Sequence, residues 1–269
     1  MVFSLNTNYN STLRGYEGTV IENNRTMPFL FCPSSNPERT RCLVILHGHG
    51  ANQNFANFRA DDWSIIIPLD RHGTDGLGSW WFGEYKDPFT YRMLQLIIQN
   101  LKSIYKLPAI YIWGSSMGGY GAILHGLACK AHAVYAHIPQ TKLAGTHYTD
   151  GRNKRFFSPL VSKRKWAFST NSVFTEPHVD LCKYLAKFRP HKSPVFFLTQ
   201  NTFDYPFYVR EHLLPFVARC DELGFAYSVT MPLIKGHKLF LNIAQAVAQN
   251  FDKEHKKIRQ WRIQGSIDT

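Results

Sequence analysis

The chain has 269 residues, 44% of them hydrophobic and 14% aromatic, a composition that excludes a disordered protein. No apolar run reaches the roughly 18 residues of a membrane-spanning helix, and the five cysteines include no Cys-x-x-Cys pair that would indicate a zinc site. The 31 Lys and Arg residues against 19 Asp and Glu give a formal charge of +12, which favours a polyanionic partner: nucleic acid, anionic lipid, acidic polysaccharide or a phosphorylated cofactor.

The first part of the chain predicts several strands. Residues 18–21 and 27–31 predict an antiparallel pair, and the apolar runs 41–46 and 63–70 are typical of buried strands. A glycine-rich polar loop follows the first of these runs. The loop after the second run carries Trp80 and Trp81, and we expect both indoles to be exposed.

From residue 88 onwards, helices and strands alternate. Further strands are predicted over 109–113, 133–138, 194–199 and 226–231, and helices over 88–106, 206–223 and 239–257. This alternation predicts an α/β fold with a mostly parallel, doubly wound sheet of about eight strands. We expect one domain over 1–269, in which 141–190 forms a cap-like insert after the sixth strand.

The segment Gly114-Ser115-Ser116-Met117-Gly118 lies between a predicted strand and a predicted helix. This is the context of a nucleophile elbow, a turn so tight that its flanking positions need glycine. Ser115 is the rival nucleophile, but only Ser116 has a glycine two positions away on each side. Ser116 is therefore the predicted nucleophile, and the alternative is a Gly/Ser-rich turn without chemistry.

A serine nucleophile needs a base, and the base needs an acid that orients it. Asp204 follows the predicted strand 194–199 in a short loop, whereas Asp221 lies inside a helical pattern and Asp180 in the irregular insert. Of the twelve histidines, only His237 lies between the last predicted strand and the last predicted helix. We therefore predict Asp204 as the acid and His237 as the base, with a solvated aspartate and a surface histidine as the alternatives.

Two backbone N–H groups are candidates for an oxyanion hole. The N–H of Met117 follows the nucleophile directly, and the loop His47-Gly48-His49-Gly50 should supply a second donor, most simply the His49 N–H. The alternative for this loop is a simple tight turn. The His47 and His49 side chains could instead bind a metal, but no third ligand lies nearby in the sequence, so no metal site is predicted.

Basic and aromatic residues gather in the insert 141–190. Such a stretch is typical of a surface that binds a polyanion, although charged runs are commonly just solvated faces. The predicted substrate-binding residues are Trp80, Trp81, Lys154, Arg155, Arg164 and Lys165.

The order serine, acid, histidine resembles the α/β-hydrolase superfamily over nearly the whole chain. The elbow segment 114–122, the aromatic loop Trp80-Trp81-Phe82-Gly83 and the stretch His137-Ile138-Pro139-Gln140-Thr141-Lys142-Leu143 also resemble bacterial capsule-biosynthesis proteins of this fold. That group includes O-acetyltransferases of acidic capsular polysaccharides. The resemblance implies acetyl-CoA as a co-substrate rather than a resident cofactor, and a capsule-assembly complex at the inner membrane surface as a partner.

Three functions remain open from the sequence. An O-acetyltransferase would pass an acetyl group from acetyl-CoA through Ser116 to a sugar hydroxyl, and this is the function we favour. A carboxylesterase would use the same triad with water, and a non-catalytic polyanion-binding module would use only the basic insert. Nucleic-acid binding fits the charge but has no recognition motif. The start of the chain lacks the pattern of a signal peptide, so we expect a cytoplasmic protein, peripheral to the inner membrane.

Overall fold

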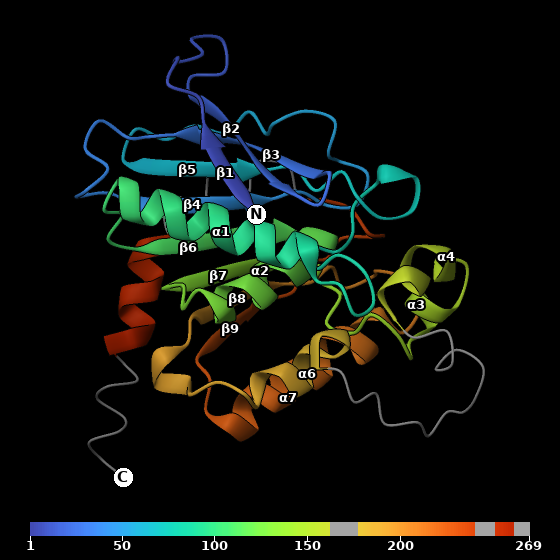
Figure 1. Cartoon of the computed structure of the whole chain (residues 1–269). Helices are drawn as coiled ribbons and strands as arrows, with labels where there is room; N and C mark the ends of the chain where they lie inside the picture. Colours follow the sequence, from blue (N-terminus) through green and yellow to red (C-terminus); the bar gives the residue numbers. More distant parts are fainter. Residues whose placement is uncertain (162–176, 240–250, 261–269) are drawn as a thin grey trace.

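The computed structural model describes residues 1–161, 177–239 and 251–260, which build one nine-stranded sheet. The strand order is β1-β2-β3-β5-β4-β6-β7-β8-β9, with β1 to β3 antiparallel and all strands from β5 to β9 parallel (Figure 1). The strands are β1 (Val2–Leu5), β2 (Tyr16–Glu22), β3 (Arg25–Cys32), β4 (Arg41–Leu46), β5 (Trp63–Pro68), β6 (Ile110–Ser115), β7 (Ala133–His137), β8 (Val195–Thr199) and β9 (Tyr227–Thr230).

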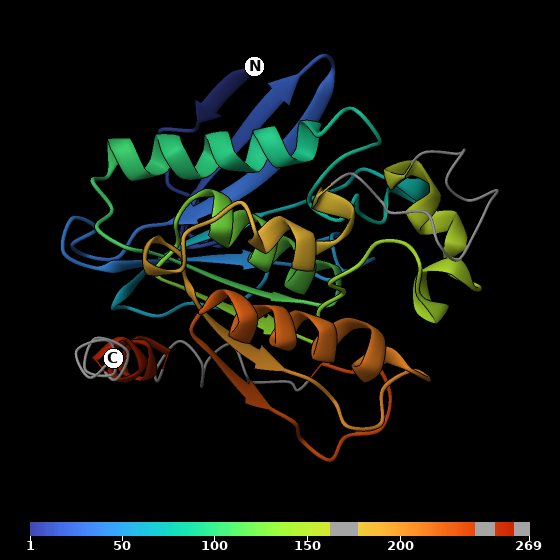
Figure 2. The ribbon, with the colours of Figure 1, turned by 90° about the horizontal axis from the view of Figure 1, so that it is seen from below.

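The central strands are buried on both faces, which is why their sequences are continuous apolar runs. In β4, Val44 and Leu46 join one core, while Leu43 and Ile45 join the other. The first core is completed by the helices α1 (Phe89–Ile104), α2 (Met117–Ala128), α6 (Leu181–Leu185) and α7 (Leu214–Leu223). The second core receives Phe251 from the C-terminal helical residues 251–260, which Figure 2 shows apart from α1 and α2.

The predicted mostly parallel α/β sheet is confirmed, with one strand more than expected. The additional strand is β1, whose polar-apolar alternation is too short to stand out in the sequence but which pairs with β2 in four register positions. The predicted helix 206–223 is a π-helical turn, Val209–Leu213, followed by α7, and Gly224 ends it with φ +72°. Of the helix predicted over 239–257, residues 240–250 lie outside the described part of the chain.

The stretch predicted as an insert follows β7 and contains only short helices in its described residues. These are α3 (His147–Asp150), α4 (Lys154–Phe157) and the 3₁₀ turns Ser158–Leu160 and Pro177–Val179, besides α6. Figure 1 shows α3 and α4 beyond the ends of the parallel strands. No helix among the described residues is both long enough and apolar enough to cross a bilayer.

Candidate active site

Ser116 lies in the sharp turn between β6 and α2. Its backbone has φ 53° and ψ −117°, a strained conformation for a residue with a side chain. The turn closes only because its flanking residues are glycines: a Cβ on Gly114 would lie 2.0 Å from the Gly118 carbonyl oxygen, and one on Gly118 would lie 2.2 Å from that of Leu46. The rival Ser115 is the last residue of β6 and is buried.

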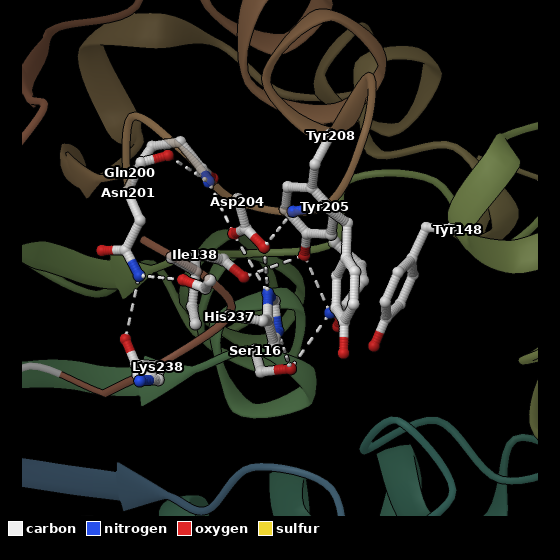
Figure 3. A network of polar contacts seen from close by, with 12 residues as sticks. Ser116, Ile138, Tyr148, Gln200, Asn201, Asp204, Tyr205, Tyr208, His237 and Lys238 are labelled. Atoms are coloured by element: carbon white, nitrogen blue, oxygen red, sulfur yellow. Dashed lines mark hydrogen bonds and ion pairs between the residues drawn. The ribbon is translucent and has the colours of Figure 1, made fainter. Parts of the chain in front are cut away.

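The side chains of Ser116, His237 and Asp204 form a continuous hydrogen-bonded chain (Figure 3). Ser116 Oγ lies 2.8 Å from His237 Nε2, and His237 Nδ1 lies 2.9 and 3.0 Å from the two carboxylate oxygens of Asp204. Because Nδ1 faces a carboxylate, the proton of the neutral ring resides there and Nε2 is free to accept the serine proton. This is the geometry that nucleophilic acyl transfer requires.

Asp204 is fixed by two further donors. Gln200 Nε2 donates to one of its carboxylate oxygens at 2.8 Å, and the Tyr205 N–H donates to the other at 2.7 Å. The Asp204 side chain is completely buried, so these bonds replace the water that an exposed carboxylate would bind. The rivals lie elsewhere: Asp180 caps α6, and Asp221 accepts a hydrogen bond from Tyr227.

Backbone hydrogen bonds join the two loops that carry Asp204 and His237. The N–H of Thr202 donates to the Pro232 carbonyl, and the Gly236 N–H donates to the Phe203 carbonyl. Gly236 has φ +86°, a left-handed conformation that glycine adopts without strain and that turns the chain into His237. These backbone bonds hold the Asp204 and His237 loops in register, independently of the side chains.

The loop after β4 lies directly against Ser116. A Cβ on Gly48 would lie 3.8 Å from the Ser116 Cβ, and the N–H of the next residue, His49, has no acceptor among the described residues. Met117 is the first residue of α2, so its N–H has no partner inside the helix. Both predicted donors therefore belong to segments that border Ser116.

The His47 side chain fixes the shape of this loop. Its Nε2 accepts a hydrogen bond from the Asp70 N–H at 2.9 Å, which requires Nδ1 to carry the proton and to donate to the Gly48 carbonyl at 2.8 Å. Burial lowers the pKa of His47, which favours this neutral form. With both ring nitrogens engaged, His47 is unavailable as a metal ligand, and the described residues contain no cluster of three potential ligands.

The chain matches no protein-family model and no curated protein. Solved structures do match it. The capsule O-acetyltransferase of Neisseria meningitidis serogroup A aligns with a TM-score of 0.62 and 18% identity, over 90% of this chain and 94% of that one. A structure of a histidine-to-alanine mutant of that enzyme, in complex with CoA, aligns with a TM-score of 0.59 and 19% identity over the same shares.

Two further matches are hydrolases. An S-formylglutathione hydrolase from Agrobacterium tumefaciens aligns with a TM-score of 0.59 and 16% identity, over 97% of this chain and 99% of that one. FphF, a fluorophosphonate-binding serine hydrolase of Staphylococcus aureus, aligns with a TM-score of 0.60 and 14% identity, over 97% and 98%. The chain has the α/β-hydrolase fold. At these identities the similarity establishes only the fold. The candidate catalytic residues therefore rest on the geometry of this chain alone.

In this α/β-hydrolase fold, Trp80 and Trp81 do not form the exposed surface that the sequence suggested. Their exposed fractions are 2% and 0%. The Trp80 indole packs on Phe157, with ring centroids 4.3 Å apart, and Trp81 fills the space beside Gly121 and donates to the His47 carbonyl. The prediction of exposed indoles is wrong because the large apolar rings gain more by supporting the loops around the elbow than by contacting solvent.

The rim of the site carries other aromatic and basic residues. The rings of Tyr148 and Tyr205 lie 5.7 and 5.4 Å from the His237 ring, and Figure 3 shows both phenols on the same side of Ser116 and His237. The Arg152 guanidinium lies over the Tyr205 ring at 5.3 Å. Of the four predicted basic residues, Lys154 and Arg155 are exposed on α4, whereas Arg164 and Lys165 lie outside the described residues.

Sequence reasoning did not single out Gln140 and Tyr208 as site residues. Gln140 is fully buried and its Nε2 lies 3.0 Å from Ser116 Oγ and 2.8 Å from the Tyr208 hydroxyl. Burial raises the pKa of Tyr208 well above its ordinary value, so the phenol keeps its proton. The only sequence signal for Gln140 was its place in the stretch 137–143, and none pointed to Tyr208.

Proposed function

We propose that this protein is a serine-dependent O-acetyltransferase. It moves an acetyl group from acetyl-CoA, through an acyl-Ser116 intermediate, to hydroxyl groups of an acidic capsular polysaccharide. The observation that carries acyl transfer is the hydrogen-bonded chain of Ser116, His237 and Asp204, with distances of 2.8 to 3.0 Å. A serine in a strained elbow, a histidine that can take its proton and a buried carboxylate that orients the histidine together support nucleophilic acyl transfer.

In the proposed first step, Ser116 Oγ attacks the thioester carbonyl carbon while His237 Nε2 takes the serine proton. The carbonyl oxygen becomes an oxyanion, for which the N–H groups of Met117 and His49 are the proposed donors. Collapse of the adduct breaks the C–S bond, and the histidine proton leaves with the CoA thiol. An acceptor hydroxyl then gives its proton to His237 and attacks the acyl carbon. The second adduct collapses, the bond to Ser116 Oγ breaks, and His237 returns the proton to that oxygen.

Two observations support the choice of donor and acceptor. The chain shares its architecture with a capsule O-acetyltransferase, one structure of which contains CoA. The formal charge of +12 would attract both a phosphorylated donor and a polyanionic acceptor. Arg152 lies over the Tyr205 ring at the rim of the site, and Lys154 and Arg155 are exposed on α4. We propose these three residues as contacts for the acidic polymer. The sequence predicts Arg164 and Lys165 for the same role, but both lie outside the described residues.

We also propose where the protein acts in the cell. Polymer made at the cytoplasmic side of the inner membrane would be accessible to a cytoplasmic enzyme, peripheral to that membrane and associated with a capsule-assembly complex. Co-sedimentation of the protein with inner-membrane vesicles that contain capsule-assembly proteins, compared with bare lipid vesicles, tests this part separately.

The release of free thiol from acetyl-CoA tests the reaction. Purified protein is incubated with acetyl-CoA alone and with acidic or neutral glycans, and thiol is measured together with acetyl groups on the glycan. We expect one equivalent of thiol per enzyme without acceptor, and continued thiol release that depends on the acidic glycan and matches the acetyl groups transferred. Glycan-independent release with free acetate would identify a hydrolase instead. Ser116→Ala should abolish turnover, whereas the matched variant Ser115→Ala should retain it.

A further inference from the structure

Gln140 lies at the nucleophile without belonging to the triad. It follows the end of β7 by three residues, is 0% exposed, and has its Nε2 3.0 Å from Ser116 Oγ. A buried amide is costly unless its donors and acceptor are all satisfied. The partners of Gln140 therefore decide which way its amide faces and what it offers the serine.

Trp80 fixes the orientation of this amide. An indole N–H is a donor only, and Trp80 Nε1 lies 3.3 Å from Gln140 Oε1. The atom that faces the indole must therefore be the carbonyl oxygen, because an NH₂ group there would place donor against donor. It follows that the NH₂ group of Gln140 faces Ser116.

Tyr208 holds the second hydrogen of the same NH₂ group. Its hydroxyl donates to the Ile138 carbonyl at 3.0 Å and so has only a lone pair to offer Gln140 Nε2, which lies 2.8 Å away. Tyr208 and Trp80 thus clamp the amide at both ends. The remaining N–H of Gln140 points at Ser116 Oγ, whose own proton is directed at His237 Nε2.

We propose that Gln140 is a catalytic residue that donates a hydrogen bond to Ser116 Oγ and stabilises the negative charge on this atom as its proton leaves. The proposal rests on Ser116 being the nucleophile of the proposed function. The oxyanion hole serves the substrate carbonyl oxygen, whereas Gln140 serves the serine oxygen. Its N–H is in place before reaction, so it costs no reorganisation when charge develops.

Labelling by a fluorophosphonate isolates this role, because it needs neither CoA nor glycan. Ser116 Oγ forms a bond to phosphorus, the P–F bond breaks, fluoride leaves, and the serine proton goes to His237. The second-order labelling rate therefore reports the attack of Oγ alone. We expect Gln140→Leu to slow labelling about ten- to hundredfold, the range for a lost hydrogen bond to a charged group.

The isosteric variant Gln140→Glu distinguishes a donor from a merely space-filling residue. A protonated carboxyl group has one O–H that can replace the amide N–H as a donor to Ser116 Oγ. An ionised carboxylate has no hydrogen to donate and would instead accept a hydrogen bond from the serine hydroxyl, turning it away from His237. The labelling rate of Gln140→Glu relative to the wild type should therefore fall as pH rises, to the level of Gln140→Leu or below. The rate of Gln140→Leu relative to the wild type should not depend on pH.

Trp80→Phe tests the clamp and has a matched control. Without the indole N–H the amide is free to turn, so labelling should slow while Gln140 itself is intact. Trp113→Phe makes the same change at a side chain whose Nε1 is buried but has no partner among the described residues, and it should label at the wild-type rate. Thermal unfolding of each variant shows whether the fold is retained.

The outcomes separate this proposal from the proposed function. If the wild-type protein is not labelled at Ser116, the nucleophile is wrong and the role of Gln140 is overturned with it. If the wild type is labelled, but folded Gln140→Leu reacts equally fast or the Gln140→Glu ratio does not change with pH, only the role of Gln140 is overturned. Slower Gln140→Leu together with the falling Gln140→Glu ratio establishes it.

Discussion

Replacing Gly118 with alanine should damage the site more than the fold. The added Cβ would lie 2.2 Å from the Leu46 carbonyl oxygen and 2.7 Å from that of His47, both backbone atoms, whereas real Cβ contacts are not shorter than 3.0 Å. The start of α2 and the loop after β4 must therefore separate by about 0.8 Å at their closest point. That movement displaces the His49 N–H, the proposed oxyanion donor, from Ser116, and a misplacement of this order costs about a hundredfold in rate.

Gly126→Ala is the matched control for this prediction. Gly126 lies in the same helix, and its added Cβ would meet a Val134 methyl group at 2.1 Å, an overlap of the same size far from the elbow. Both variants should lose about 1–3 kcal/mol of unfolding free energy from overpacking, but only Gly118→Ala should lose kcat on acetyl-CoA or on a neutral ester. Urea unfolding and steady-state kinetics measure the two effects. Equal kcat values for the two variants would refute the proposed role of the loop after β4.

Three further predictions concern the Asp204–His237 pair, the basic residues at the rim of the site and the buried His125. Asp204→Asn and His237→Ala should each lower kcat by thousands-fold, and the double variant by little more, because the residues act as a unit; additive losses would mean that Asp204 is not the acid. Arg152→Ala with Arg155→Ala should raise KM for an acidic polymer and flatten its salt dependence without affecting a neutral ester, whereas equal losses would indicate a structural role. Burial lowers the pKa of His125 to about 4, below its unfolded value near 6.5. The unfolded chain therefore binds a proton at His125 before the folded protein does, so the stability that the neutral ring supplies is present above pH 6.5. It is lost as pH falls from 6.5 toward 4, by up to about 1.4 kcal/mol per pH unit. His125→Gln should reduce the pH dependence of the unfolding free energy, measured with urea, between pH 6.5 and 4. An unchanged pH dependence would contradict a lowered pKa of His125.

The sequence predicted those parts of the molecule that local rules control. Gly114 and Gly118 mark the elbow because no other residue fits where a Cβ would lie about 2 Å from a backbone atom. Asp204 and His237 could be selected by position alone, because the carboxyl ends of parallel strands meet at one edge of the sheet. Their meeting with Ser116 is thus a consequence of chain order and topology.

The remaining features depend on packing between distant segments. Trp80 and Trp81 resemble exposed loop residues in the sequence. They are buried because Trp80 packs against Phe157 and Trp81 packs against α2, contacts that only the folded structure reveals. Gln140 contacts Ser116 across a sequence separation of 24 residues, with an orientation set by Trp80. Such contacts have no signature in a single sequence, because each involves residue types that are common elsewhere.

The proposed acyl-Ser116 intermediate is tested most directly by finding which residue carries the acetyl group during turnover. The protein is quenched in acid shortly after mixing with acetyl-CoA in the absence of acceptor, and the digested peptides are analysed by mass spectrometry. We predict an acetyl group on Ser116, present in Ser115→Ala, absent in Ser116→Ala, and removed when an acidic glycan is added before the quench. An acetyl group on Ser115 or on another residue, or acetylation that survives in Ser116→Ala, would contradict the account.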